Sequence, residues 1–173
     1  GDQIADIFSS WNSTEELSSY LVEITEICLR TKDPNDKTDL VEKIMDKAGQ
    51  KGTGLWTVVS ALELGASVPT IYASLNARVM SSMKSQRILA EPLLKAPDLK
   101  GFYLGDSTNG MSDLKDAVVV AAIVSYAQGM DLLQIASNEY DYDLDMPSIA
   151  QIWKGGCIIR SRLLGRIRDA FNK

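Results

Sequence analysis

Apolar residues recur at helical spacing along most of the chain. Between residues 17 and 28 the apolar positions are three or four residues apart, the period of one helix face, and they are Leu17, Tyr20, Leu21, Ile24 and Cys28. Just before them, Ser13 and Glu16 have the spacing of a capping box. The pattern predicts an amphipathic helix that follows Ser13 and ends before the turn-forming residues 33–36.

The same spacing predicts a series of further helices. Residues 4–8 form a short apolar face, and residues 40–45 carry four apolar side chains that we expect to face inward in a second helix. Residues 55–64 predict a well-buried helix, closed by Gly65 just after its end. Pro69 suits the first turn of the next helix, because a missing N–H costs nothing there.

The longest predicted helix covers residues 113–138, with Ser112 or Asp113 as its cap. Its residues 117–122 are apolar on every side, so we expect this helix to be central and buried. A short helix that begins at Pro147 then leads to a basic helix at the end of the chain. Because no convincing alternating pattern of a strand occurs, the chain is predicted to be all-α.

A length of 173 residues is enough for one domain with its own core, and we expect a single helical domain over residues 1–173. Residues 92–110 contain prolines and glycines and are the best candidate for a boundary inside it. Two early stretches resemble two later ones, residues 4–8 and 149–153, and residues 19–22 and 161–164. This similarity indicates either a helical duplication or a coincidence between two amphipathic helix pairs.

Composition excludes several kinds of chemistry. The chain has no histidine, which removes a Ser-His-Asp or Cys-His mechanism and the commonest zinc ligand. It has no Cys-x-x-Cys pair either, so no metal site is predicted. Cys28 and Cys157 lie in apolar helical runs, where we expect buried free thiols, and this favours a reducing compartment.

The charge distribution bears on possible partners. The net charge of −5 argues against nucleic-acid binding, although residues 154–173 carry six basic residues and a single acid. Such a segment can bind phosphates or a membrane surface, but more often it is a solvated face. The chain has no run of about 18 uninterrupted apolar residues. We therefore predict that neither a nucleic acid nor a membrane is a partner.

A glycine-rich stretch at residues 48–54 is the clearest candidate site. Three glycines surround Lys51 and Thr53, and an apolar helical run follows at once. Glycines let backbone N–H groups approach an anion, and the start of the helix adds its positive dipole end. Lys51 would supply a positive charge for phosphate and Thr53 a hydroxyl donor. The alternative is an ordinary connector, since the stretch is neither a Walker A loop nor a GxGxxG motif.

Arg78 lies in the middle of the helix that follows Pro69, among small and mostly uncharged residues. A guanidinium in such a place must find a carboxylate, a carbonyl or an anionic ligand, because burying it unpaired is too costly. Phosphate is the functional candidate, since a guanidinium binds it bidentately. A structural salt bridge or a surface arginine is the alternative.

The sequence Ala-Gly-Gln-Lys-Gly-Thr-Gly at residues 48–54, followed by Trp56 and Thr57, resembles the signature of the 6-phosphogluconate dehydrogenases. Four more blocks resemble the same family in the right order, at residues 19–25, 77–87, 125–130 and 152–161. Leu55 stands where the family commonly has lysine, which removes one positive charge near the loop. Together the five blocks are spread over nearly the whole chain.

The resemblance implies an NADP-dependent oxidoreductase of the pentose phosphate pathway. Such an enzyme oxidises and decarboxylates 6-phosphogluconate to ribulose 5-phosphate, and the resemblance further implies a cytoplasmic homodimer. The chain would be part of the all-α C-terminal domain, which binds substrate and forms the dimer. In that domain Lys51, Thr53 and Arg78 occupy the positions that contact the phosphate of the substrate.

The resemblance also implies that essential parts of the enzyme lie outside this chain. The family's N-terminal domain, which binds most of the NADP, has no counterpart here. Its catalytic lysine and glutamate and its C-terminal section are absent as well. We therefore assign no catalytic residue and expect the chain alone to be inactive. Because the chain has neither an initiator methionine nor a signal peptide, we expect Gly1 to mark a boundary within a longer protein.

Two other interpretations remain open. The chain could be a non-catalytic helical module of the same fold, which binds a partner or a phosphate ligand. It could also come from another member of the wider hydroxyacid dehydrogenase group, which would bind a carboxylate substrate without the phosphate donors. Survival of Lys51, Thr53 and Arg78 argues against both, whereas Leu55 leaves the first one open.

Overall fold

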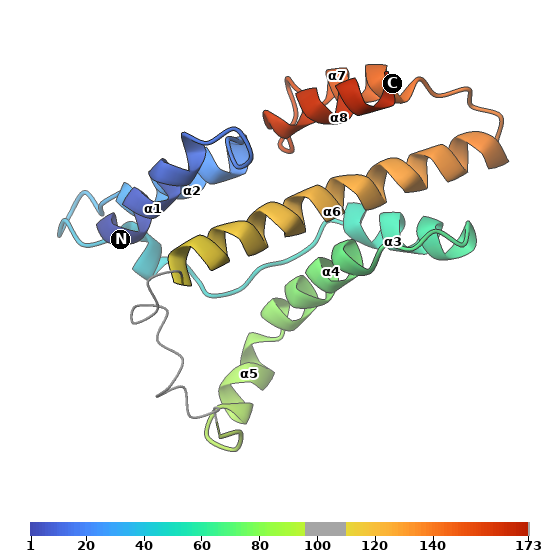
Figure 1. The fold of residues 1–173 in the computed structure, drawn as a ribbon. Coiled ribbons are helices and arrows are strands. Elements are labelled where there is room, and N and C mark those ends of the chain that lie inside the picture. The colour runs from blue at the N-terminus through green and yellow to red at the C-terminus, as the bar shows by residue number, and fades with distance from the viewer. Residues whose placement is uncertain (96–109, 173) are drawn as a thin grey trace. The chain divides into compact units, whose positions relative to one another are not determined.

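In the computed structural model, which describes residues 1–95 and 110–172, all the regular elements are helices (Figure 1). Within those ranges no strand forms, and two isolated bridges join Ser19 to Ser161 and Lys32 to Asp39. The all-α prediction is therefore confirmed. The predicted boundary at residues 92–110 lies almost entirely outside the described residues. The expectation of one domain over the whole chain stays a prediction.

The chain forms two compact units. The terminal unit comprises Gly1–Met45 and Tyr142–Lys173, so it contains both ends of the chain, and the central unit comprises Asp46–Asp141. The glycine-rich loop and Arg78 both belong to the central unit. The predicted phosphate donors are therefore all carried by one unit.

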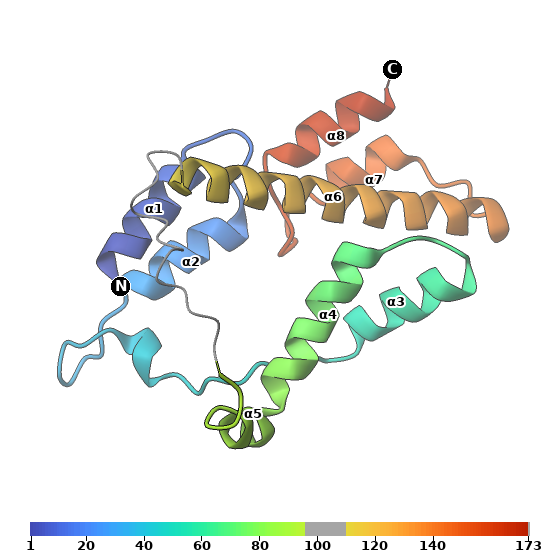
Figure 2. The ribbon, with the colours of Figure 1, turned by 60° about the horizontal axis from the view of Figure 1, so that its bottom comes forward.

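The terminal unit contains two helix pairs. Helix α1 (Asp2–Asn12) packs against α2 (Tyr20–Arg30), and α7 (Met146–Ile152) packs against α8 (Leu163–Phe171), as Figures 1 and 2 show. Ala5 of α1 and Ala150 of α7 are both completely buried. These two alanines hold the same position in the two similar stretches, so each pair is closed at the same place by a small side chain.

The segments that precede α2 and α8 run against each other. The backbone N–H of Tyr20 donates to the Arg160 carbonyl at 3.1 Å, and the N–H of Arg162 donates to the Ser18 carbonyl at 3.0 Å. The two bonds are reciprocal about the bridge between Ser19 and Ser161. Corresponding residues of the two similar stretches therefore meet, which favours a helical repeat over a coincidence.

The predicted capping box at Ser13 is wrong. Ser13 ends α1, because its N–H bonds to the Ser9 carbonyl and its hydroxyl donates to the Ser10 carbonyl at 2.6 Å. Helix α2 is capped instead by Ser19, whose backbone is extended and whose hydroxyl accepts from the Val22 N–H at 3.3 Å. A serine already engaged in the last turn of one helix cannot supply the extended backbone that a cap requires.

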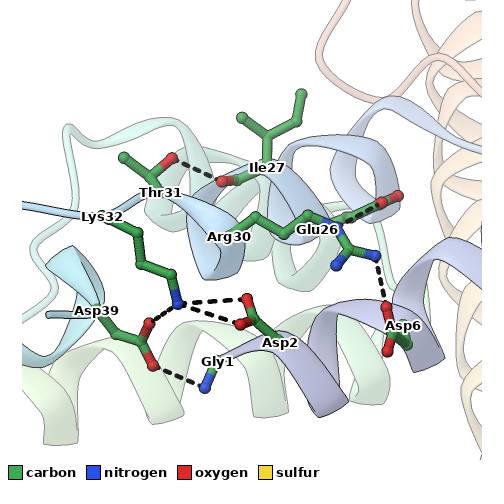
Figure 3. Close-up of polar contacts among 9 residues, drawn as sticks. All are labelled: Gly1, Asp2, Asp6, Glu26, Ile27, Arg30, Thr31, Lys32 and Asp39. Atoms are coloured by element: carbon green, nitrogen blue, oxygen red, sulfur yellow. Dashed lines mark hydrogen bonds and ion pairs between the residues drawn. The ribbon is translucent and has the colours of Figure 1, made fainter. Parts of the chain in front are cut away.

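Ion pairs on the surface join α1 to the end of α2 and to the segment after it (Figure 3). The guanidinium of Arg30 lies 2.7 Å from Asp6, and the ammonium of Lys32 contacts both Asp2 and Asp39. The hydrogen bond from Lys32 is the main reason that the pKa of Asp39 falls to about 2. All these cations are therefore neutralised by neighbouring carboxylates.

The turn predicted at residues 33–36 is confirmed, but the helix predicted at residues 40–45 is wrong. The N–H of Asp33 bonds to the Thr38 carbonyl, and only a single turn of 3₁₀-helix, η1 (Leu40–Lys43), follows. Met45, expected to face inward, is 69% exposed. The ammonium of Lys43 contacts two carboxylates of the turn. The stretch between this turn and the glycine-rich loop is too short to form a stable helix by itself.

In the central unit, α3 (Thr53–Glu63) and α6 (Gly110–Glu139) both pack against α4 (Pro69–Ser82). A short helix, α5 (Lys84–Ala90), follows α4. The core of this unit is made of small and branched side chains, namely Ala61, Ala66, Val68 and Leu132. Two predicted boundaries are confirmed, since Gly65 has a φ of +69° just after α3 and Pro69 is the first residue of α4.

The side chain of Gln128 on α6 fixes the start of α4. Its carbonyl oxygen accepts from the N–H groups of Thr70 at 3.0 Å and Ile71 at 3.3 Å, which have no acceptor inside α4. Its amide nitrogen donates to the Thr70 hydroxyl at 3.1 Å. The helix that carries Arg78 is therefore held at its N-terminus by the long helix α6.

The predicted burial of α3 and α6 is wrong. On α3 the buried residues are Val58 and Ala61, whereas Leu62 is 75% exposed. On α6 only 11% of the most apolar 18-residue window is buried, and by length and composition alone this helix could cross a membrane. Both helices carry more apolar surface than the described neighbours cover. The two cysteines are free as expected, but Cys28 is exposed and Cys157 only half-buried.

Candidate functional site

The glycine-rich loop enters α3 through a backbone conformation that only glycine adopts readily. Gly52 precedes the first helical residue with a φ of +105°, in the left-handed region. A Cβ atom there would also lie 3.4 Å from the ring of Trp56. The carbonyl of Gly52 accepts the first helical bond, from the Trp56 N–H at 2.9 Å. Gly52 thus sets the direction in which α3 starts.

This start leaves donors available to an anion. Thr53 is the first residue of α3, so its N–H and those of Gly54 and Leu55 have no acceptor within the helix. The side chains of Lys51 and Thr53 are exposed. Within the described residues, the ammonium of Lys51 forms neither a hydrogen bond nor an ion pair. Such a group of amides, a hydroxyl and a free ammonium can bind phosphate.

Arg78 reaches this loop from α4. Its Nε donates to the Gly49 carbonyl at 3.0 Å, and its Nη2 donates to the same oxygen. A carbonyl was one of the partners expected for this guanidinium. The Nη1 group makes no hydrogen bond within the described part of the chain, so the guanidinium retains both its charge and free donors. The structure therefore brings Arg78 to the loop two residues before Lys51.

Two residues without an assigned role in the sequence analysis hold the loop in place. The hydroxyl of Ser81 accepts from the Ala48 N–H at 2.9 Å. The guanidinium of Arg87 donates to the Asp46 carboxylate at 2.9 Å and to its carbonyl at 2.8 Å, and this pairing lowers the pKa of Asp46. Arg78 and Ser81 are three positions apart on one helix face, a spacing that could have linked both residues to the same loop.

The sequence around the loop is basic although the whole chain is acidic. Residues 46–90 contain two acids, Asp46 and Glu63, and five basic residues, namely Lys47, Lys51, Arg78, Lys84 and Arg87. The chain as a whole has a net charge of −5. This local excess of positive charge favours an anionic ligand at the loop. Within residues 1–95 and 110–172, no cluster of three metal-binding side chains occurs.

Comparison with known proteins identifies the family. Residues 1–173 match the family model described as 6-phosphogluconate dehydrogenase, C-terminal domain. The chain belongs to this family. The resemblance inferred from the five sequence blocks is therefore confirmed, and the all-α fold agrees with it.

Individual members of the 6-phosphogluconate dehydrogenase family match along almost the whole chain. The decarboxylating 6-phosphogluconate dehydrogenase of Synechocystis sp. is 48% identical over 170 residues, which cover 98% of this chain and 35% of that protein. The human enzyme of the same name is 46% identical over 172 residues, covering 99% and 35%. The chain thus spans about a third of the length of these relatives.

A solved structure agrees with the fold. The 6-phosphogluconate dehydrogenase of Plasmodium falciparum matches with a TM-score of 0.88 and 38% identity, over 99% of this chain and 36% of that one. That protein has been described in its apo form, with its cofactor NADP+ and with its substrate 6-phosphogluconate. The likeness covers the loop and α4 as well as both helix pairs.

Proposed function

We propose that this chain is part of the substrate-binding and dimerisation domain of an NADP-dependent 6-phosphogluconate dehydrogenase. The complete enzyme would oxidise 6-phosphogluconate and release CO2 to give ribulose 5-phosphate in the cytoplasm. The observation that carries the proposal is the attachment of Arg78 to the loop of Lys51 and Thr53, in a chain 48% identical to such an enzyme. A non-catalytic phosphate-binding module is the second candidate, favoured only by Leu55.

Lys51, Thr53 and Arg78 would hold the phosphate of the substrate. Lys51 and the guanidinium of Arg78 would neutralise its charge, while the Thr53 hydroxyl and the first N–H groups of α3 would donate hydrogen bonds. Because the phosphate is remote from the reacting carbon atoms, these contacts position the substrate and do not take part in the chemical step. We assign no catalytic residue to this chain.

The described residues do not suit NADP. A dinucleotide is usually held by a glycine-rich turn between a strand and a helix, and the described residues contain no strand. NADP would therefore bind mainly to an N-terminal domain outside this chain, where it would accept the hydride. The contribution of this chain is to present the substrate in a fixed position.

We also propose that α3 and α6 form a homodimer interface. Trp56 on α3 is 65% exposed, and Val120 and Ile123 on α6 are exposed as well. Large apolar side chains exposed on a helix can mark an interaction surface, and a second subunit would remove them from water. Dimer burial would also account for the apolar composition of α6 without a membrane. Val120→Glu with Ile123→Glu should shift the full-length protein to monomers in sedimentation experiments.

The first test is NADPH formation by the full-length protein that contains this chain. Supplied with 6-phosphogluconate and NADP, that protein should form NADPH, whereas the 173-residue chain alone should form none. Formation of NADPH by the chain alone would contradict the absence of catalytic residues. No turnover by the full-length protein would favour the non-catalytic module.

A further inference from the structure

A second group of basic side chains lines a pocket in the terminal unit. The pocket has a volume of about 310 Å³ and lies where the segment before α2 meets the segment before α8. Lys154, Arg160 and Arg162 line it, together with Ser18 and Tyr20. Its residues all belong to the terminal unit, and none belongs to the glycine-rich loop or to α4.

These three cations differ from most of the other basic residues of the same unit. The described part of the terminal unit has nine basic residues, and five of them form ion pairs with carboxylates, namely Arg30, Lys32, Lys43, Arg166 and Arg168. A sixth, Lys37, donates to a backbone carbonyl. The remaining three all line the pocket, and none of them pairs with a carboxylate among the described residues. Such a cluster of unneutralised cations in an acidic chain favours the binding of an anion.

Backbone hydrogen bonds hold the segment of Arg160 and Arg162 in place without neutralising either side chain. The reciprocal bonds between Tyr20 and Arg160 and between Arg162 and Ser18 fix the two segments. The guanidinium of Arg160 lies over the ring of Tyr20, 3.7 Å from its centroid, and donates to the Cys157 carbonyl at 3.1 Å. A ligand would therefore find the guanidinium of Arg160 already positioned, which reduces the entropy lost on binding.

We propose that this pocket binds the phosphate group of a small phosphate monoester. Three cations against the single carboxylate of Glu23 leave an excess of two positive charges. A phosphate monoester carries a charge of about −1.5 to −2 at neutral pH, and arginine is well suited to bind it bidentately. The volume is at the lower end of the range for small-molecule pockets, which suits a metabolite of a few carbon atoms.

The experiment uses the full-length protein with Arg78→Ala, so that the loop site is weakened. Calorimetric titrations at low salt with inorganic phosphate and with glycerol 3-phosphate would be compared with those of Lys154→Gln/Arg162→Gln in the same background. We expect at least tenfold weaker binding of glycerol 3-phosphate in the double variant. Lys37→Gln is the matched control, because it removes a cation that lies outside the pocket, and it should change nothing.

Equal affinity with and without the double substitution would overturn the proposal, as would an equal loss in Lys37→Gln. Binding of inorganic phosphate alone would identify free phosphate as the occupant and overturn the assignment to an ester. Lys154 and Arg162 are exposed and unpaired among the described residues, so the double variant should fold. The two sites share no residue, so this result is separable from that of the loop site.

Discussion

Basic side chains are held in two different ways in this chain. On the terminal unit, Arg30, Lys32 and Lys43 each contact two carboxylates. On the central unit, Arg78 donates to the carbonyl of Gly49. A carboxylate neutralises a cation, whereas a carbonyl orients it and leaves its charge in place. The first arrangement supports the fold, and the second leaves a cation ready for an anion.

The pocket of the terminal unit belongs to the second kind. Arg160 is oriented by a carbonyl and an aromatic ring, and Arg162, two residues later, has no carboxylate partner within residues 1–95 and 110–172. The same unit therefore contains both arrangements. Exposure does not separate the two arrangements, because Arg30 and Arg78 are both exposed.

Under the proposed function, the largest effect should come from Arg78→Ala in the full-length protein. Losing one charge-assisted contact to phosphate should raise KM for 6-phosphogluconate by about 10- to 100-fold, with a smaller change in kcat. Arg30→Ala is the matched control, because its guanidinium is already neutralised by carboxylates. Steady-state kinetics would contradict the difference between Arg78 and Arg30 if both variants had the same KM as the wild type.

Gly52→Ala should cost stability, because its φ of +105° is unfavourable for any residue with a Cβ. We expect a loss of about 1–2 kcal/mol in the free energy of unfolding, measured by denaturant titration. The control is Gly49→Ala, since Gly49 is not in the left-handed region and a Cβ there would meet no atom within 4 Å. Similar losses in the two variants would mean that the entry into α3 is not strained.

Ser81→Ala should loosen the loop without removing a contact to the substrate. The Ala48 N–H would lose its acceptor, and Lys51 and Arg78 would be less well positioned. We expect KM for 6-phosphogluconate to rise about three- to fivefold, as for the loss of one neutral hydrogen bond. Ser82→Ala is the control, because in the described part of the chain its hydroxyl bonds only to the Val79 carbonyl of the same helix. An equal rise in Ser82→Ala would exclude a specific role of the loop bond.

The smallest effect should come from Lys43→Met, which removes a cation that is already neutralised by carboxylates. Hydrogen bonding to Lys43 is the first cause that lowers the pKa of Asp33, so the substitution should raise that pKa in a carboxyl NMR titration. A carboxyl whose pKa is lowered in the folded state stabilises the fold at pH values above its ordinary pKa. The difference in stability between wild type and variant should therefore disappear as the pH falls through the lowered pKa. Lys37→Met should leave this pKa unchanged.

Much of the helical pattern was predictable from local sequence. Gly65 and Pro69 marked the end of α3 and the start of α4, because their backbone preferences act without tertiary contacts. The cap of α2 was not predictable in the same way. Ser13 and Ser19 are both suitable cap residues, and the choice between them depends on where α1 ends.

The candidate site was predictable only in part. Lys51, Thr53 and Arg78 could be named because their side chains suit phosphate and because the sequence resembles a known family. The hydrogen bonds that Arg78, Ser81 and Arg87 make to the loop join residues 29 to 41 positions apart. No local pattern encodes which carbonyl or hydroxyl a distant side chain will reach.

By itself the sequence determined the helical class, most of the helices and the types of donor available for an anion. Those properties follow from side-chain periodicity, backbone preference and chemical type, which are local. Only the tertiary structure decided which cations face carboxylates and which face carbonyls, and which apolar faces this chain leaves exposed. Both depend on distances in the folded chain, because electrostatic interaction and burial are set by position in space.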